Sequence, residues 1–290
     1  MIKIIKSLRA HPFNATDKIG AIGRFIKWQI SARLNPQPIV HPFTEHSKLW
    51  VKKGMTGATG NLYSGLHEFY DMGFLLHFLR ENDLFIDVGA NIGSYTVLAS
   101  AEIKAFSLSF EPVPSTFSYF KNNILINDIQ HLVTPLNIGL GSKKDVLKFT
   151  KSHDTENHIA TESDTDTIDV EIDILDNIIA ERQPNLLKID VEGFETEVLN
   201  GAETTLNKPS LKAIIIELNG EGSRYGFDEK AIHAKLLDKG FATYRYDPLS
   251  RKLVEAENAE NDNVIYVRDV DFVRNRLATA RKIKVQNRFI

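Results

Sequence analysis

The stretch "FIDVGANIGSYT" at residues 85–96 runs from a short apolar strand, through an acidic residue and a turn containing two glycines, into the start of a helix. Glycine permits backbone conformations and close approaches that a Cβ atom forbids. In an open α/β sheet, ligands bind outside the carboxyl ends of the strands. The stretch therefore predicts a buried strand followed by a turn that lies against a small molecule.

The segments on either side of this turn alternate between strand-like and helical patterns. Such alternation favours βαβ units under one mostly parallel sheet. Residues 241–247 and 264–269 are too close in sequence to form a parallel pair, so we expect them to complete the sheet as an antiparallel hairpin. The parallel strands are predicted at 84–88, 106–110, 133–138, 186–190 and 213–218.

Composition limits the classes of function. The 290-residue chain has a formal net charge of -3, 25% charged residues and no cysteine. This mixture is ordinary for a globular protein, gives no case for nucleic-acid binding, and excludes disulfides and thiolate chemistry. No apolar run reaches the roughly 18 residues of a membrane-spanning helix, so the cytoplasm is the expected location.

Both ends of the chain are basic. Residues 1–60 carry ten Lys and Arg side chains against only two acids. Within this part, residues 17–34 predict an amphipathic helix, because five apolar residues recur at helical spacing. Contact with an anionic membrane surface or an acidic glycan is one interpretation of the basic ends, but solvated helix faces are the favoured one. The five residues are Ile19, Ile22, Phe25, Ile26 and Ile30.

The residues of the glycine turn indicate which ligand it binds. Gly89 and Gly93 do not match the dinucleotide fingerprint, and Asn91 stands where its middle glycine would be. Asp87 would repel a pyrophosphate but attract a cation, and S-adenosylmethionine carries a sulfonium and an ammonium group. Glu111 follows the second strand and suits hydrogen bonds to ribose hydroxyls. The pattern favours adenosylmethionine over NAD; the structural alternative is that Asp87 and Asn91 only cap the next helix.

Four segments resemble, in order and spacing, the FkbM-type methyltransferases. The resemblance spans about residues 66–219 and does not cover the N-terminal extension. It implies a Rossmann-like class I methyltransferase fold, with a mostly parallel seven-stranded sheet, an adenosylmethionine donor and O-methylation, often of a sugar or polyketide hydroxyl. The segments are "FIDVGANIGSYTVLAS", "FEPVPSTFSYFKNNILIN", "LNIGLGS" and "LLKIDVEGFETEVLNGA".

The resemblance also implies a domain plan and a set of cofactor contacts. We expect a partly helical extension at 1–60, a catalytic domain at 61–270 and a basic C-terminal helix at 271–290. The residues that match the family's motifs, and so are implied to contact the cofactor, are Asp87, Gly89, Asn91, Gly93 and Glu111, with Asn137 near the adenine.

Methyl transfer to a hydroxyl requires positioning and removal of the acceptor's proton. Asp190 and Glu217 end the fourth and fifth strands, so we expect them to face one another across the cleft, with Glu192 beside them. They are interpreted either as a general base (Asp190 or Glu192) with Glu217 orienting the acceptor, or as oxygen ligands of Mg²⁺. A structural alternative is that Glu192 and Glu195 favour the start of the next helix. Lys188 is expected to be structural.

His67 completes the candidate catalytic residues. It lies in a predicted helix before the first strand and could act as a base or contact the acceptor, although such a histidine is more often ordinary surface or core. Tyr63, Tyr95 and Arg224 are further candidate acceptor contacts. The polar segment 150–168 is expected to form a loop or an edge hairpin; its two histidines show no metal-ligand spacing, so no metal ligand is assigned.

The expected function is an O-methyltransferase that acts on a hydroxylated small molecule or a glycan. A non-catalytic cofactor-binding module is the main alternative, but a decayed module would tend to lose the glycine turn or the acids. A methyltransferase acting on the nitrogen of a nucleic-acid base would carry an Asn/Asp-Pro-Pro-aromatic element where this chain has "KIDVEG". A nucleic-acid substrate is therefore not expected.

Overall fold

The computed structural model describes residues 2–151, 157–161, 164–256 and 263–290. Its centre is an eight-stranded sheet in the order β12-β11-β13-β10-β9-β3-β4-β5. The five strands from β5 to β10 in this order are parallel, and the others are added antiparallel. The strands are β3 (Leu84–Val88), β4 (Phe106–Phe110), β5 (Val133–Leu136), β9 (Leu186–Ile189), β10 (Ala213–Glu217), β11 (Ala242–Asp247), β12 (Lys252–Glu255) and β13 (Asn263–Val267).

This sheet confirms the predicted α/β architecture and corrects the number of strands. The C-terminal hairpin is present, because β11 pairs antiparallel with β13. The eighth strand, β12, lies in the segment between them and pairs with the outer side of β11. Only one of its four residues is buried, so its sequence resembles a polar turn more than a strand.

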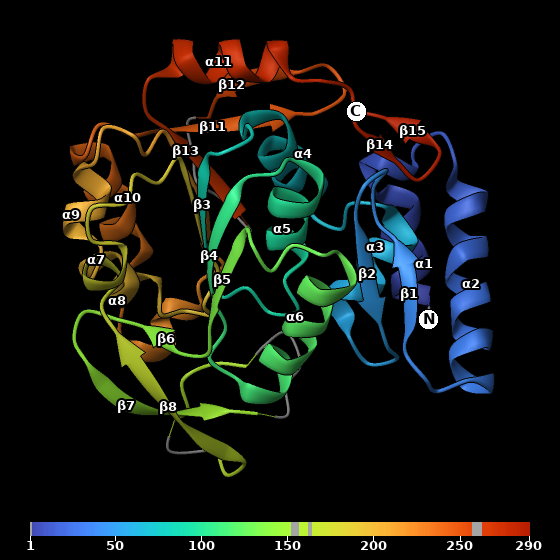
Figure 1. Cartoon of the computed structure of the whole chain (residues 1–290), viewed down its shortest axis with the longest axis horizontal. Coiled ribbons are helices and arrows are strands. Elements are labelled where there is room, and N and C mark those ends of the chain that lie inside the picture. The colour runs from blue at the N-terminus through green and yellow to red at the C-terminus, as the bar shows by residue number, and fades with distance from the viewer. Residues whose placement is uncertain (1, 152–156, 162–163, 257–262) are drawn as a thin grey trace.

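Helices cover both faces of the sheet (Figure 1). One face carries α4 (Phe69–Phe78), α5 (Ser94–Val97), the π-helix η2 (Leu98–Glu102) and α6 (Pro114–Ile126). The other carries α7 (Leu175–Ile179), α8 (Glu195–Asn200), α9 (Glu203–Asn207) and α10 (Glu229–Asp238). Alternate residues of β10 enter the two cores: Ile215 packs with the first group and Ile214 with the second. Side chains pointing to opposite faces of a strand explain this division.

A smaller sheet lies at the edge of the domain. It has the order β6-β8-β7 and consists of β6 (Gly139–Leu140), β7 (Asp145–Thr150) and β8 (Thr167–Asp173). The predicted segment 150–168 connects β7 with β8, which pair antiparallel. Residues 152–156 and 162–163 of that segment, including His153, lie outside the described residues.

The N-terminal part packs against the first face of the domain. It contains α1 (Ile2–Ala10), the 3₁₀ turn η1 (Pro12–Asn14), α2 (Lys18–Leu34), the hairpin of β1 (Ile39–Pro42) and β2 (Lys48–Val51), and α3 (Thr56–Ser64). Leu8, Phe25 and Trp28 belong to the same hydrophobic core as α4 and α5. Helix α3 crosses the boundary expected at residue 60, in a glycine-rich stretch whose composition is more typical of a loop.

Helix α2 forms where the sequence predicts it, but most of the predicted apolar residues are not on its buried face. Ala21, Phe25, Trp28 and Ala32 are buried, whereas Ile19, Ile26 and Ile30 are exposed. The rings of Phe25 and Tyr63 lie 5.2 Å apart, so this side of the helix packs on α3. Two small alanines on that side permit the close approach, a feature that a count of large apolar residues misses.

The C-terminal helix ends earlier than expected. Helix α11 covers Val270–Thr279, and a two-stranded hairpin of β14 (Lys284–Val285) and β15 (Arg288–Phe289) replaces the predicted helix at 280–290. Gln286 has a positive φ of 51° in the turn, and Ile283 and Val285 are buried at alternate positions. This period of two is typical of a strand. No helix among the described residues is long and apolar enough to cross a membrane.

Candidate functional site

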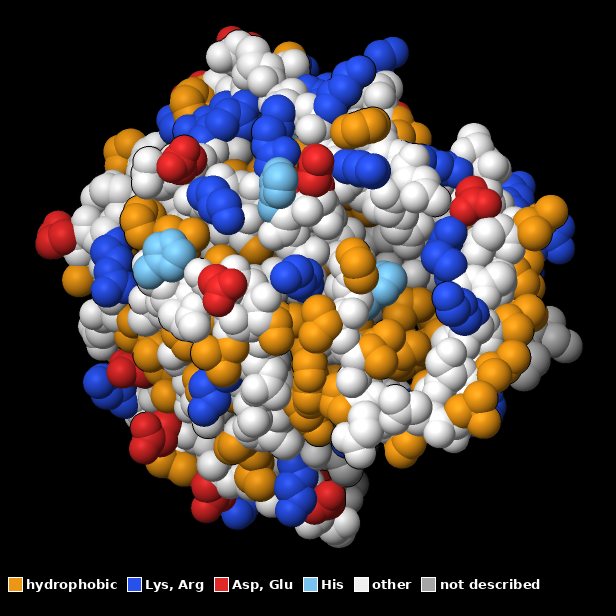
Figure 2. Space-filling view, turned by 45° about the vertical axis from the view of Figure 1, so that its right-hand side comes forward, with side chains coloured by type: hydrophobic (Ala, Val, Ile, Leu, Met, Phe, Trp, Pro, Cys, Tyr) orange, Lys and Arg blue, Asp and Glu red, His pale blue; other side chains and the backbone are white. Residues whose placement is uncertain are grey.

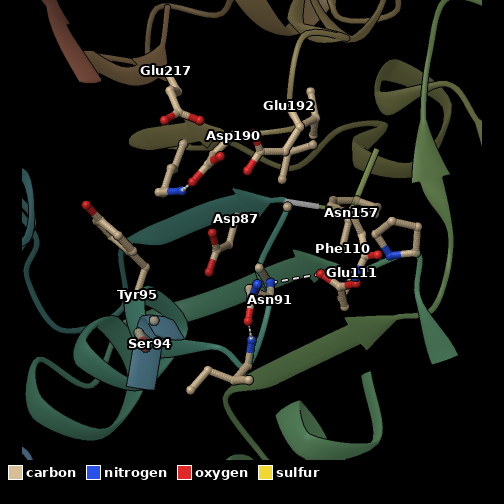
Figure 3. Close-up of a pocket in the computed structure, with 18 of the residues that line it drawn as sticks. Asp87, Asn91, Ser94, Tyr95, Phe110, Glu111, Asn157, Asp190, Glu192 and Glu217 are labelled. Carbon is tan, nitrogen blue, oxygen red and sulfur yellow. Dashed lines mark hydrogen bonds and ion pairs between the residues drawn. The ribbon is translucent and has the colours of Figure 1, made fainter. Parts of the chain in front are cut away.

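The site forms where the strand order reverses, between β3 and β9. Here a cavity of about 360 Å³ opens at the carboxyl ends of the parallel strands. A crevice at this position is the usual ligand site of an open α/β sheet. The glycine turn, the acids at the carboxyl ends of β9 and β10, and part of α3 line it. Figure 3 shows side chains of the glycine turn and of these acids facing one another across the space.

The two glycines of the turn lie at positions where a side chain would not fit. Gly89 has a φ of 81°, and a Cβ atom there would lie 1.7 Å from the backbone oxygen of Asp190. Gly93 has a φ of 84°, and a Cβ atom there would lie 2.2 Å from the Phe120 ring. The backbone nitrogens of Gly89 and Ala90 donate to the Phe110 carbonyl oxygen, at 3.1 and 2.8 Å. The turn thus joins β3 to β4 and presents its backbone to the cavity.

Glu111 and Asn91 are joined across this turn (Figure 3). The Glu111 carboxylate accepts hydrogen bonds from the backbone nitrogens of Asn91 and Val113, both at 2.9 Å. Burial raises the pKa of Glu111 to about 7, although the two N–H donors oppose this shift. Glu111 lines the cavity. Each of its oxygens retains acceptor capacity, so the position is compatible with the predicted contact to ribose hydroxyls.

Asp87 is buried, and one of its two carboxylate oxygens has a hydrogen-bond partner. Its Oδ2 accepts a hydrogen bond from the Thr96 hydroxyl at 2.7 Å. Among the residues that the structure describes, no group donates to its Oδ1. Burial raises the pKa of Asp87, and the nearby Lys188 ammonium only partly offsets it. A buried carboxylate oxygen without a partner is costly, and an ammonium group in the cavity would satisfy it.

Asn137 is held against the backbone that follows β4, and its predicted place near the adenine stays a prediction. Its amide donates to the carbonyl oxygens of Glu111 and Pro112, at 2.8 and 2.9 Å. The neighbouring Ile138 lines the cavity, whereas Asn137 is not among the lining residues. Asn137 therefore fixes the backbone after β4, which positions Glu111.

The three acids at the carboxyl ends of β9 and β10 form one cluster, as predicted. Oxygen atoms of Asp190, Glu192 and Glu217 lie within 4.8 Å of one another (Figure 3). Burial, followed by the charge of Asp190, raises the pKa of Glu192 to about 9 and that of Glu217 to about 10. At neutral pH both glutamates are thus protonated, and Glu217 donates a hydrogen bond to Asp190.

Lys188 keeps Asp190 ionised. Its Nζ lies 2.6 Å from Asp190 Oδ2, and the side chain is almost fully buried above the Tyr95 ring, 4.7 Å from the ring centroid. Burial alone would raise the pKa of Asp190, but the Lys188 ammonium and the Glu217 hydrogen bond lower it. The site therefore contains one carboxylate that is held charged between two neutral carboxylic acids.

His67 lies at the entrance of the cavity but not in the predicted helix. Gly65, with a φ of 81°, ends α3, and α4 begins only at Phe69, so His67 is in the connection between them. Its side chain is exposed and lines the cavity. Its backbone nitrogen donates to Asn61 Oδ1 at 2.7 Å, which fixes the connection against α3.

Several lining residues could not be recognised in the sequence. Asn61 reaches the site because α3 packs beside the glycine turn, and its amide donates to the Ser94 hydroxyl at 3.3 Å. Glu221 belongs to the 3₁₀ helix η4 (Glu221–Tyr225), and Asn157 to the segment after β7. Tyr225 donates to the Ile159 carbonyl oxygen at 2.8 Å and so joins these two walls. None of these residues has a motif of its own.

The other candidate residues occupy the margins of the site. Glu195 accepts hydrogen bonds from the backbone nitrogens of Val191 and Gly193, at 3.2 and 3.1 Å, and so supports the turn before α8, in line with the structural alternative for this residue. Arg224 donates to the Glu192 carbonyl oxygen at 3.4 Å. Tyr63 packs on Phe25 and does not line the cavity. His158 lies 3.6 Å from Asp164.

Comparison with known proteins identifies a matching family. Residues 87–243 match the family model described as "Methyltransferase FkbM domain". The hexuronic acid methyltransferase AglP of Haloferax volcanii is 31% identical over 180 residues, which cover 61% of this chain and 70% of that protein. The 31-O-demethyl-FK506 methyltransferase FkbM of Streptomyces tacrolimicus is 26% identical over 218 residues, 62% of this chain and 82% of that protein.

Solved structures are more distant. The rRNA methylase of Streptococcus thermophilus is 12% identical, with a TM-score of 0.40, and the match covers 68% of this chain and 93% of that one. At this distance the likeness carries no information about an acceptor.

Proposed function

We propose that this chain, which belongs to the FkbM methyltransferase family, transfers a methyl group from S-adenosylmethionine to a hydroxyl of a sugar, a glycan or a small natural product. The chain has the Rossmann-like class I methyltransferase fold and is a methyltransferase by family. The donor and the class of acceptor are the parts that we propose.

The observation that carries the choice of donor is the free Oδ1 of Asp87. A buried carboxylate with an unsatisfied oxygen near the end of β3 attracts a cationic ligand and repels a pyrophosphate. Adenosylmethionine brings an ammonium group, and Glu111 lies at the end of the next strand, where ribose hydroxyls would need an acceptor. NAD would place two phosphates in a cavity lined by seven acidic residues. These are Glu68, Asp87, Glu111, Asp190, Glu192, Glu217 and Glu221.

The acceptor class is supported by the relatives and by the acids of the site. Two relatives are named as methyltransferases of a hexuronic acid and of 31-O-demethyl-FK506. Carboxylates and carboxylic acids together offer both acceptors and donors of hydrogen bonds, which suits a polyhydroxylated molecule. We infer that the acceptor contacts Asp190, Glu192 and Glu217.

When bound, adenosylmethionine supplies an electrophilic methyl group. The residues of the chain supply position and a proton acceptor. Asp190, held ionised by Lys188, accepts the hydroxyl proton, while protonated Glu217 fixes the orientation of Asp190 through its hydrogen bond. The proton need leave only as the new carbon–oxygen bond forms, so a weakly basic carboxylate suffices.

In a second hypothesis, the three acids are ligands of a divalent cation such as Mg²⁺. Asp190, Glu192 and Glu217 each offer an oxygen ligand, and these atoms lie within 4.8 Å of one another. A bound cation would deprotonate the two glutamates and lower the pKa of the acceptor hydroxyl. Titration with Mn²⁺ followed by electron paramagnetic resonance separates the hypotheses. Binding that is lost in Glu217→Gln supports the cation, and no binding supports Asp190 as a base.

Isothermal titration calorimetry with adenosylmethionine, adenosylhomocysteine and NAD tests the donor. We expect micromolar adenosylmethionine binding that Asp87→Asn weakens about tenfold or more, because a charge-assisted hydrogen bond contributes about 1.5–3 kcal/mol. Glu111→Ala is expected to weaken binding of both adenosyl ligands. Asp238→Asn, an exposed change at the end of α10, is the matched control. Tighter binding of NAD than of adenosylmethionine would refute the proposal.

Screening of hydroxylated acceptors with radiolabelled adenosylmethionine tests the reaction. Once an acceptor is found, Asp190→Asn should lower kcat by about 10²–10⁴-fold and leave adenosylmethionine affinity near the wild-type value. Unchanged turnover in this variant would remove Asp190 from the role of base.

A further inference from the structure

Helix α2 has two apolar faces, and only one of them is covered. Ala21, Phe25, Trp28 and Ala32 pack against the domain. On the opposite side, Ile19, Ile26, Ile30 and Leu34 are 87%, 48%, 54% and 82% exposed. Their spacing of seven, four and four residues places them on one line along the helix. We call these four residues the α2 stripe.

The surroundings of the α2 stripe are strongly basic. Lys18, Lys27 and Arg33 are exposed on the same helix, and Lys3, Lys6 and Arg9 are exposed on α1. No acidic residue occurs between Asp17 and Glu45. Asp17 itself lies 2.8 Å from the Arg24 guanidinium, so it does not neutralise the exposed cations. Figure 2 shows hydrophobic side chains in a line along the right-hand part of this face, with Lys and Arg side chains beside them.

We propose that the α2 stripe docks on an anionic lipid bilayer, with α2 lying in the plane of the surface. The four aliphatic side chains would enter the boundary between headgroups and acyl chains, and the lysines and arginines would contact anionic headgroups. In this arrangement the apolar stripe meets the acyl chains of the bilayer, and the flanking cations meet its anionic headgroups.

Charge disfavours a second copy of the chain as the occupant. Two α2 helices packed stripe to stripe would bring Lys18, Lys27 and Arg33 of both copies together without an intervening acid. Like charges in contact are repulsive, and the repulsion grows when water is excluded. An anionic bilayer removes that repulsion.

Vesicle flotation with the full-length chain tests the proposal. We expect binding to vesicles in which about a third of the lipid is phosphatidylglycerol, weaker binding to pure phosphatidylcholine, and release by high salt. The quadruple variant Ile19→Ser/Ile26→Ser/Ile30→Ser/Leu34→Ser should lower the partition coefficient about tenfold or more. The control is Val146→Ser/Leu249→Ser/Val254→Ser, which removes side chains more than half exposed elsewhere and should bind as the wild type does.

Further measurements control for misfolding of the variant and for self-association of the chain. Thermal unfolding and adenosylmethionine titration show whether the quadruple variant is folded; if it is not, the single changes Ile19→Ser and Leu34→Ser, at the most exposed positions, replace it. Absence of vesicle binding by the wild type, or equal binding by the stripe variant, would overturn the proposal. So would a dimer in light scattering that the stripe variant converts to a monomer. These outcomes are independent of whether the proposed methyl transfer is correct.

Discussion

The ammonium of Lys188 keeps the neighbouring carboxylate of Asp190 ionised. It is buried, contacts Asp190 at 2.6 Å and faces the carboxylates of Asp87 and Glu68. Burial alone would lower the pKa of Lys188, but these three negative charges raise it. A residue that the sequence suggests is structural therefore belongs to the electrostatics of the site.

Lys188→Met should destabilise the fold in a pH-dependent way. In the wild type the pKa of Asp190 is below its ordinary value of 3.8, so its ionised form contributes stability above that pH, which is lost as the pH falls through the folded-state pKa. Without Lys188, burial raises the pKa of Asp190 above the ordinary value, and the buried charge becomes unfavourable at neutral pH.

We expect Lys188→Met to lose about 3–5 kcal/mol of unfolding free energy near pH 8, with a smaller loss near pH 5, where Asp190 takes up a proton. Urea unfolding at both pH values measures the difference. Lys148→Met removes an exposed ion pair with Asp169 and should cost at most about 1 kcal/mol at either pH. A loss in Lys188→Met that does not change with pH would contradict the argument.

Among the elements, those with a strong local signal were predictable. The turn after β3 could be predicted because an acid and two glycines lie at the end of an apolar strand. The cluster of acids at the ends of β9 and β10 could be predicted because the carboxyl ends of parallel strands meet at one edge of the sheet. The buried face of α2 could not be predicted from the sequence. The helix is apolar on both sides, and only its contact with α3 determines which side is buried. The position of Asn61 depends on that same packing and has no local signal.

Gly93→Ala tests how strictly the turn requires glycine. The φ of 84° is unfavourable for alanine, and the new Cβ atom would lie 2.2 Å from the Phe120 ring. We expect a loss of about 2–4 kcal/mol in unfolding free energy, measured by urea denaturation. Gly23→Ala is the matched control: nothing lies within 4 Å of its Cβ position in α2, so it should gain up to about 1 kcal/mol from helix propensity. Equal effects of the two changes would refute the explanation.

At the scale of the whole molecule, Glu102 joins three distant parts of the chain. It lies at the end of η2 with a fully buried side chain and accepts hydrogen bonds from the Thr44 hydroxyl and, at 2.9 Å, from the His46 backbone nitrogen. Its other oxygen accepts from the Arg281 guanidinium at 2.5 Å. The N-terminal part, the central domain and the C-terminal segment after α11 thus share one carboxylate as well as one hydrophobic core.

This connection predicts that the basic N-terminal part unfolds together with the rest. Both tryptophans of the chain, Trp28 and Trp50, lie within residues 1–60, so fluorescence reports on that part while far-ultraviolet circular dichroism reports on the whole. In urea, the two signals of the wild type should change at the same midpoint, as in a two-state transition. Glu102→Ala leaves buried donors without their acceptor and should cost about 2–4 kcal/mol, moving both midpoints together. If fluorescence changed first, and Glu102→Ala lowered only the fluorescence midpoint, residues 1–60 would be a separately unfolding unit and the shared core would not be what holds them in place.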